Sequence, residues 1–169
     1  QGKLGWVDVF EPDQTDRWQA QYYKQNPADA GYNPNSTDDA SLATVSQEEF
    51  WRVKGPTGAQ SKVRIYWDNE SKLDKIVDNY SNDLRIAEWS RTGNQWNQAG
   101  DEVNTGDNTI ETNNRRSIDE HPYTFGSANY TKPTVELEAI QADICEGEEA
   151  TIRFELTGEG PWELTYNHP

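Results

Sequence analysis

The 169-residue chain carries 30 acidic and 15 basic residues, which gives a formal net charge of −15. Nucleic acids and anionic membranes select clustered Lys and Arg and repel such a surface, so the composition excludes both as partners. No apolar run approaches the roughly 20 residues that a membrane-spanning helix needs. Aromatic residues make up 11% of the chain, which supplies large packing units for a core and argues against disorder.

The chain begins at Gln1 and contains no Met. We therefore expect a mature or excised piece of a longer protein, from which any signal peptide has been removed.

Short runs of alternating apolar and polar residues, separated by turn residues, recur along the chain and are typical of a β-sandwich or barrel. In chain order, the predicted strands cover residues 5–10, 17–23, 63–67, 84–89, 96–100, 109–112 and 123–127. A long exposed loop is expected at residues 26–40, which are rich in Pro, Gly, Asn, Ser and Asp. For residues 42–51 a short helix capped at Ser46 competes with a strand, and a strand is favoured for residues 50–53.

The character of the sequence changes at residues 129–133. Further strands are predicted at residues 135–140, 150–156 and 162–166, the last two separated by a Gly-Pro turn. Because about seven strands normally complete a sandwich, this second part is too short to be one. We predict an all-β chain, with an aromatic-rich antiparallel β-sandwich at residues 1–130 and the incomplete start of another domain at 131–169.

Two stretches resemble modules of large secreted surface proteins of the Bacteroidota. In the first, the ordered motifs are AQYY at 20–23, NP at 26–27, VSQEEFW at 45–51, IYWD at 65–68, LRIAEW at 84–89, Trp96 and YTFGS at 123–127. In the second, ICEGEEAT at 144–151 and LTGEGPWELTY at 156–166 are similar to the opening of immunoglobulin-like repeats. The resemblance implies an extracellular, cell-surface location, export by the type IX route, and an immunoglobulin-like fold for residues 131–169.

Cysteine and histidine suggest no catalytic or zinc site. Cys145 is the single cysteine, and either it forms a disulfide with a cysteine outside this segment or it is a buried free thiol. His121 and His168 have no metal-ligand spacing, and both are expected to be solvated surface residues. His121 precedes Pro122, which favours an extended backbone, and we place it in a loop.

Acidic clusters make calcium the one cofactor that the sequence suggests. Calcium takes six to eight oxygen ligands, which an acidic loop can supply. The candidate ligands are Asp68, Asn69, Glu70 and Asp74, with a second cluster at Asp101, Glu102, Asp107 and Asn108. Neither cluster has the residue order of a helix-loop-helix calcium site, so a solvated turn is the alternative for each.

Enzymatic activity is not expected. A glycosidase needs two carboxyls held across a cleft, and nothing singles out such a pair among the acidic residues. There is no nucleophile elbow and no phosphate-binding loop. Exposed tryptophans can stack on sugars, but Trp51, Trp67, Trp89 and Trp96 alternate with polar neighbours and are predicted to lie in the core. The roles of Trp6 and Trp18 stay open.

The sequence therefore favours a non-catalytic structural or adhesive segment of a surface fibre, whose partners are the neighbouring domains of the same chain. A carbohydrate-binding accessory module of a secreted polysaccharide-degrading enzyme is the first alternative. A component of a secretion or gliding assembly is the second. Exposed edge strands would also permit self-association.

Overall fold

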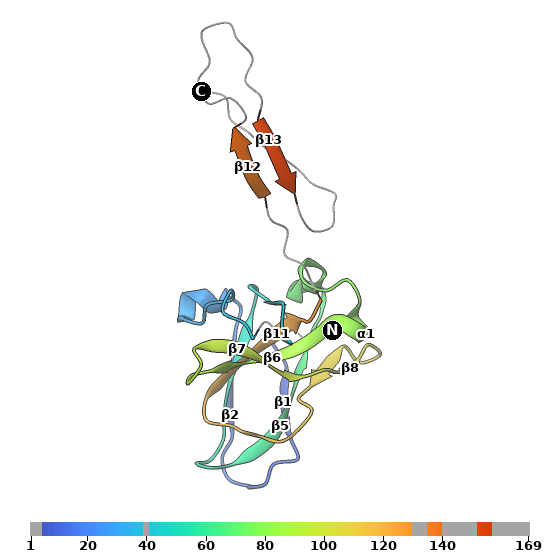
Figure 1. The fold of residues 1–169 in the computed structure, drawn as a ribbon. Helices are drawn as coiled ribbons and strands as arrows, with labels where there is room; N and C mark the ends of the chain where they lie inside the picture. The colour runs from blue at the N-terminus through green and yellow to red at the C-terminus, as the bar shows by residue number, and fades with distance from the viewer. Residues whose placement is uncertain (1–4, 39–40, 130–134, 140–151, 157–169) are drawn as a thin grey trace, which may run out of the picture. The chain divides into compact units, whose positions relative to one another are not determined.

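The computed structural model describes residues 5–38, 41–129, 135–139 and 152–156. The chain divides into two compact units, Gln1–Tyr130 and Thr131–Pro169. The first unit consists of two antiparallel sheets packed together (Figure 1), which confirms the predicted all-β sandwich. Within the described residues, no helix combines the length and apolar character needed to cross a bilayer.

The sheets are formed from strands that alternate between them along the chain. One sheet contains β1 (Val7–Phe10), β5 (Gln60–Tyr66), β9 (Thr109–Glu111) and β8 (Glu102–Asn104) in that order, with β10 (Arg116–Ser117) also paired to β5. The other contains β2 (Gln19–Tyr23), β4 (Phe50–Lys54), β11 (His121–Ser127), β6 (Leu84–Ser90) and β7 (Gln95–Gly100), with β3 (Thr44–Val45) paired to β11. We call them the β1–β8 sheet and the β2–β7 sheet.

Short helical turns occupy the connections between strands. They are η1 (Pro27–Ala30), η2 (Asn69–Ser71), η3 (Leu73–Lys75) and the single α-helical turn α1 (Tyr80–Asp83). Each of the seven strands predicted in the first unit is present, within a few residues of its predicted bounds. Residues 50–53 form a strand, as favoured, since they belong to β4.

The main core lies between the two sheets and follows the alternation of each strand. Val63 and Ile65 of β5 face Trp51 and Val53 of β4 across the interior, and all four side chains are fully buried. Trp67 completes this cluster at the end of β5, and its ring meets that of Phe125 edge-on. Burial of such side chains is the main force that holds the sheets together.

A second, smaller core covers the outer face of the β2–β7 sheet. Trp89 and Trp96 pair across β6 and β7 and pack with Leu42, while the half-buried Tyr32 contacts both tryptophan rings. All four tryptophans predicted to be in the core are thus buried, two in each cluster. Residues 26–38 form the predicted loop, with one helical turn at 27–30, but the loop is not exposed throughout, because Tyr32 packs on Trp89 and Trp96 of β6 and β7.

The second unit contains one described pair of strands. β12 (Val135–Ala139) and β13 (Ile152–Leu156) form an antiparallel two-stranded sheet. Both strands were predicted, whereas the strand expected at residues 162–166 lies outside the described residues. The immunoglobulin-like character of this unit stays a prediction.

Candidate ligand-binding face

A hollow of about 600 Å³ opens on the outer face of the β2–β7 sheet, at the edge formed by β2 and β4. We call it the β2–β4 hollow. Its lining consists of Arg17, Trp18, Gln19, Ala20, Gln21, Arg52, Lys54 and Glu120. A volume in this range is typical of sites for small molecules.

The register of β2 and β4 explains why polar side chains gather here. Gln19 pairs with Lys54 and Gln21 pairs with Arg52. Successive side chains of a strand point to opposite faces. Since Trp51 and Val53 lie in the core between the sheets, Arg52 and Lys54 are directed outward together with their partners.

Trp18 contributes a ring with a fixed orientation. Its indole Nε1 donates a hydrogen bond to the Gln14 carbonyl oxygen at 3.1 Å. Its six-membered ring lies against Gly55, where a Cβ would come within 2.5 Å of Trp18 Cζ3. The side chain is half-buried and packs against the main core between the sheets, and its remaining surface contributes to the lining of the hollow.

Arg52 is held between two aromatic rings. Its guanidinium carbon lies 5.4 Å from the centroids of both the Tyr23 and Tyr32 rings, within the range of cation–π attraction. Nη2 donates to the Tyr32 hydroxyl at 2.6 Å, whereas the buried Nε has no hydrogen-bond partner among the described residues. Arg52 makes no ion pair with any described residue.

The charge in the hollow is opposite to that of the whole chain. Three cationic side chains and one carboxylate line it. The Lys54–Glu120 pair is 3.8 Å apart with both side chains about half exposed, so it is a weak interaction. The side chain of Arg17 makes no hydrogen bond or ion pair within the described part of the chain. The local excess of two positive charges stands against an overall charge of −15.

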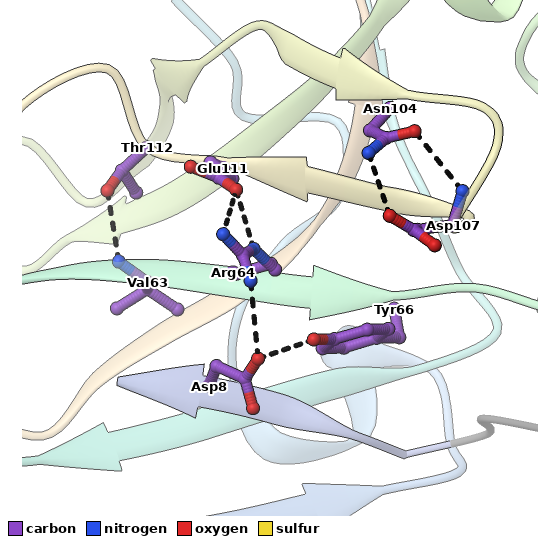
Figure 2. A network of polar contacts seen from close by, with 8 residues as sticks. All are labelled: Asp8, Val63, Arg64, Tyr66, Asn104, Asp107, Glu111 and Thr112. Atoms are coloured by element: carbon purple, nitrogen blue, oxygen red, sulfur yellow. Dashed lines mark hydrogen bonds and ion pairs between the residues drawn. The ribbon is translucent and has the colours of Figure 1, made fainter. Parts of the chain in front are cut away.

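Arg64, in contrast, is an arginine whose charge is paired within the fold (Figure 2). It lies on β5 between Asp8 of β1 and Glu111 of β9, and it forms ion pairs with both carboxylates. The Tyr66 hydroxyl donates a hydrogen bond to the same Asp8 carboxylate. Arg64 is therefore neutralised by its cross-strand neighbours, as Arg52 is not.

The predicted calcium ligands lie around η2 and η3. The Asp68 carboxylate accepts a hydrogen bond from the Glu70 backbone N–H and caps η2. Asn69, Glu70 and Asp74 are exposed. Asp68, Asn69 and Asp74 line a hollow of about 450 Å³ together with Lys72, whose positive charge opposes cation binding. Among the described residues, no group of three or more His, Cys, Asp or Glu is placed to hold a metal ion. Calcium binding stays a prediction.

The second acidic cluster is engaged in turn contacts. Asp107 accepts a hydrogen bond from the Asn104 side-chain amide (Figure 2), and the Asp101 backbone N–H donates to Asn113.

Cys145 and His168 lie outside the described residues. Trp6 is 56% exposed. Its ring meets that of Tyr66 edge-on, and much of the indole stays open to solvent.

His121 is not the solvated loop residue that was expected. It begins β11, and its Nδ1 lies 2.7 Å from Oε1 of Glu88 on β6. The extended backbone that Pro122 favours is that of a strand. Since a carboxylate only accepts hydrogen bonds, Nδ1 carries the proton in this contact.

Glu88 is the buried centre of a four-residue polar network that the sequence did not indicate. Its side chain is 8% exposed. Besides His121, it accepts from Arg116 Nε at 2.5 Å and from the Tyr123 hydroxyl at 3.0 Å. Burial raises the pKa of Glu88, but the His121 hydrogen bond and the Arg116 charge outweigh it and hold this pKa below the ordinary value of 4.5. Because Arg116 belongs to β10 and Glu88 to β6, the network links the two sheets.

Comparison with known proteins adds no relative: no family model matches the chain, and neither curated proteins nor solved structures show a significant similarity to it. The β2–β4 hollow and the Glu88 network are therefore interpreted from their chemistry.

Proposed function

We propose that this chain is a non-catalytic adhesive segment of a large secreted bacterial surface protein, and that the β2–β4 hollow binds glycan. The resemblance of residues 20–127 and 144–166 to Bacteroidota surface modules supports the setting. The observation that carries the binding role is the hollow itself, in which two exposed side-chain amides and two guanidinium groups lie beside the edge of a half-buried indole. Such a site offers an apolar surface for a sugar ring and donors for its hydroxyls.

The test is a glycan array followed by titration of each hit, monitored by intrinsic tryptophan fluorescence. We expect saturable binding that is lost in the double variant Gln19→Ala/Gln21→Ala, because both exposed amides face the hollow. Trp6→Ala is the control, since it removes the most exposed described tryptophan from outside the hollow. Loss of binding in the control but not in the double variant would place the site elsewhere and refute the assignment.

A structural role is supported by the way in which the chain leaves the sandwich. β11 lies inside the β2–β7 sheet and pairs with β4 on one side and β6 on the other. Directly after it, the Ala128 N–H donates to the Asp83 carbonyl at 3.0 Å, and the Asn129 amide donates to the Asp83 carboxylate at 2.6 Å. These contacts tie the exit segment to α1.

A segment that transmits force should resist being pulled from this end. Pulling on the two chain ends in single-molecule force spectroscopy measures that resistance directly. We expect Asn129→Ala to lower the force at which the first unit unfolds, whereas an equivalent change at the exposed Asn69 should leave it unchanged. Equal unfolding forces for Asn129→Ala and the parent protein would contradict the proposed clamp.

A further inference from the structure

The arginines of the β2–β4 hollow lack the carboxylates that this acidic chain could readily provide. The chain has twice as many acidic as basic residues, and Arg64 is paired with two of them. The Arg17 side chain makes no hydrogen bond or ion pair with a described residue, and among the described lining residues the one carboxylate, that of Glu120, lies beside Lys54. A guanidinium group is always charged and presents a planar fork of donors that matches a carboxylate.

The fixed position of Arg52 favours an anion at one place in the hollow. Its guanidinium lies near both the Tyr23 and Tyr32 rings and donates a hydrogen bond to the Tyr32 hydroxyl. A charge that is already oriented loses little conformational entropy when a ligand binds. Arg17, which is exposed and makes no side-chain ion pair with a described residue, lines the same hollow and adds to its positive charge.

The surrounding charge limits how many anionic groups a ligand can carry. At physiological ionic strength, charges are screened over about 8 Å, so one anion in the hollow feels mainly the local positive excess. A densely charged polymer extends beyond the hollow and meets the field of a protein whose net charge is −15. Repulsion over that length opposes binding.

We propose that the β2–β4 hollow selects a glycan whose terminal sugar carries a single carboxylate, which is attracted by the positive charge that Arg17 and Arg52 contribute. This inference rests on the proposed function, namely that the hollow binds glycan. The amides of Gln19 and Gln21 bind the sugar hydroxyls, and the two arginines distinguish an acidic sugar from a neutral one.

The experiment compares two disaccharides that differ only in this group, one ending in glucuronate and the other in glucose. Isothermal titration calorimetry on the full chain should give an affinity about tenfold higher for the glucuronate form, as expected for a charge-assisted pair. The preference should disappear in Arg17→Gln and shrink at high salt. Arg115→Gln is the matched control, because it makes the same change in net charge at an arginine outside the hollow.

The possible results separate this inference from the function on which it rests. Equal affinity for the two disaccharides would overturn the selection of an acidic sugar and leave glycan binding intact. A preference that Arg115→Gln removes as fully as Arg17→Gln would also overturn it, because overall charge would then be the cause. Tighter binding, per carboxylate, of polygalacturonate would refute the limit to a single charge. If the protein bound no glycan on the array and neither disaccharide in the calorimeter, the proposed function itself would be overturned.

Discussion

The ion pair between Glu88 and Arg116 joins the two sheets, and replacing Glu88 by Gln tests how much it stabilises the fold. The Glu88 side chain is 8% exposed and that of Arg116 is 32% exposed. Removing one partner of a fully buried pair costs about 3–5 kcal/mol. Here water can still reach Arg116, and the Gln oxygen can still accept from Tyr123. We therefore expect Glu88→Gln to lower the free energy of unfolding by about 2–3 kcal/mol, a large part of the 5–15 kcal/mol typical of a domain.

Urea unfolding monitored by tryptophan fluorescence measures this loss, and Glu11→Gln provides the matched control. Glu11 also pairs with an arginine, Arg115, but at 3.8 Å and with both side chains about half exposed. Such a surface pair contributes about 0–1 kcal/mol. If Glu88→Gln and Glu11→Gln changed the free energy of unfolding equally, the network around Glu88 would not hold the sheets together and the reasoning would be refuted.

Three further changes test other features of the first unit. The pKa of Glu88 is lowered in the folded state, so its contribution to stability is present above its ordinary pKa of 4.5 and is lost as pH falls through the lower folded value. As the pH is lowered from above 4.5 through that folded value, the urea midpoint should fall more steeply for the parent protein than for Glu88→Gln. Tyr22 donates to the fully buried Glu49 carboxylate at 2.6 Å, and the other Glu49 oxygen has no partner. Tyr22→Phe should therefore lower the free energy of unfolding in urea by about 1.5–3 kcal/mol. Adding Glu49→Gln to this variant should restore part of the lost stability. If it restores none, an unsatisfied carboxylate at Glu49 is not the cause of the loss. A Cβ at Gly100 would lie 2.0 Å from a backbone oxygen of β9, so Gly100→Ala should lower the melting temperature measured by circular dichroism, whereas Gly106→Ala, which meets only a side-chain oxygen at 3.3 Å, should change it little.

The sheet architecture could be predicted because alternation leaves a direct trace in the sequence. In β5, Val63 and Ile65 are buried while Lys62 and Arg64 are half-buried on the other side. This period of two is what a sheet with one covered face requires. Strands β3, β8 and β10 were missed because runs of two or three residues carry little periodic signal, although the equally short β9 was predicted.

Coverage of both faces could not be predicted from β6 alone. Ile86 lies in the main core, whereas Ala87 and Trp89 lie in the second core under the segment that carries Tyr32. Alternation within a strand indicates that its faces differ, but it does not reveal that a distant loop covers the second one. The loop composition of residues 26–40 therefore concealed a packing role for Tyr32.

The candidate sites depend on register, which the sequence does not specify. Glu88 pairs with Tyr123 across β6 and β11, and nothing in either strand alone indicates the pairing. In the hollow, the alternating polar residues at 19, 21, 52 and 54 were a signal that both strands have a polar face. Only the pairing of β2 with β4 shows that these two faces are one surface.

The proposed ligand binding and the proposed transmission of force would be connected through a single strand. β4 carries Arg52 and Lys54 on its outer face and pairs directly with β11, with Arg52 opposite Pro122. β11 is also the strand from which the chain passes to Asn129 and the Asp83 contacts. A load applied at that end therefore reaches the ligand-bearing strand through adjacent hydrogen bonds of the same sheet, without crossing the core. In an adhesive segment this arrangement places the proposed glycan contacts next to the strand that bears tension, so the two proposed roles need not compete for separate parts of the fold.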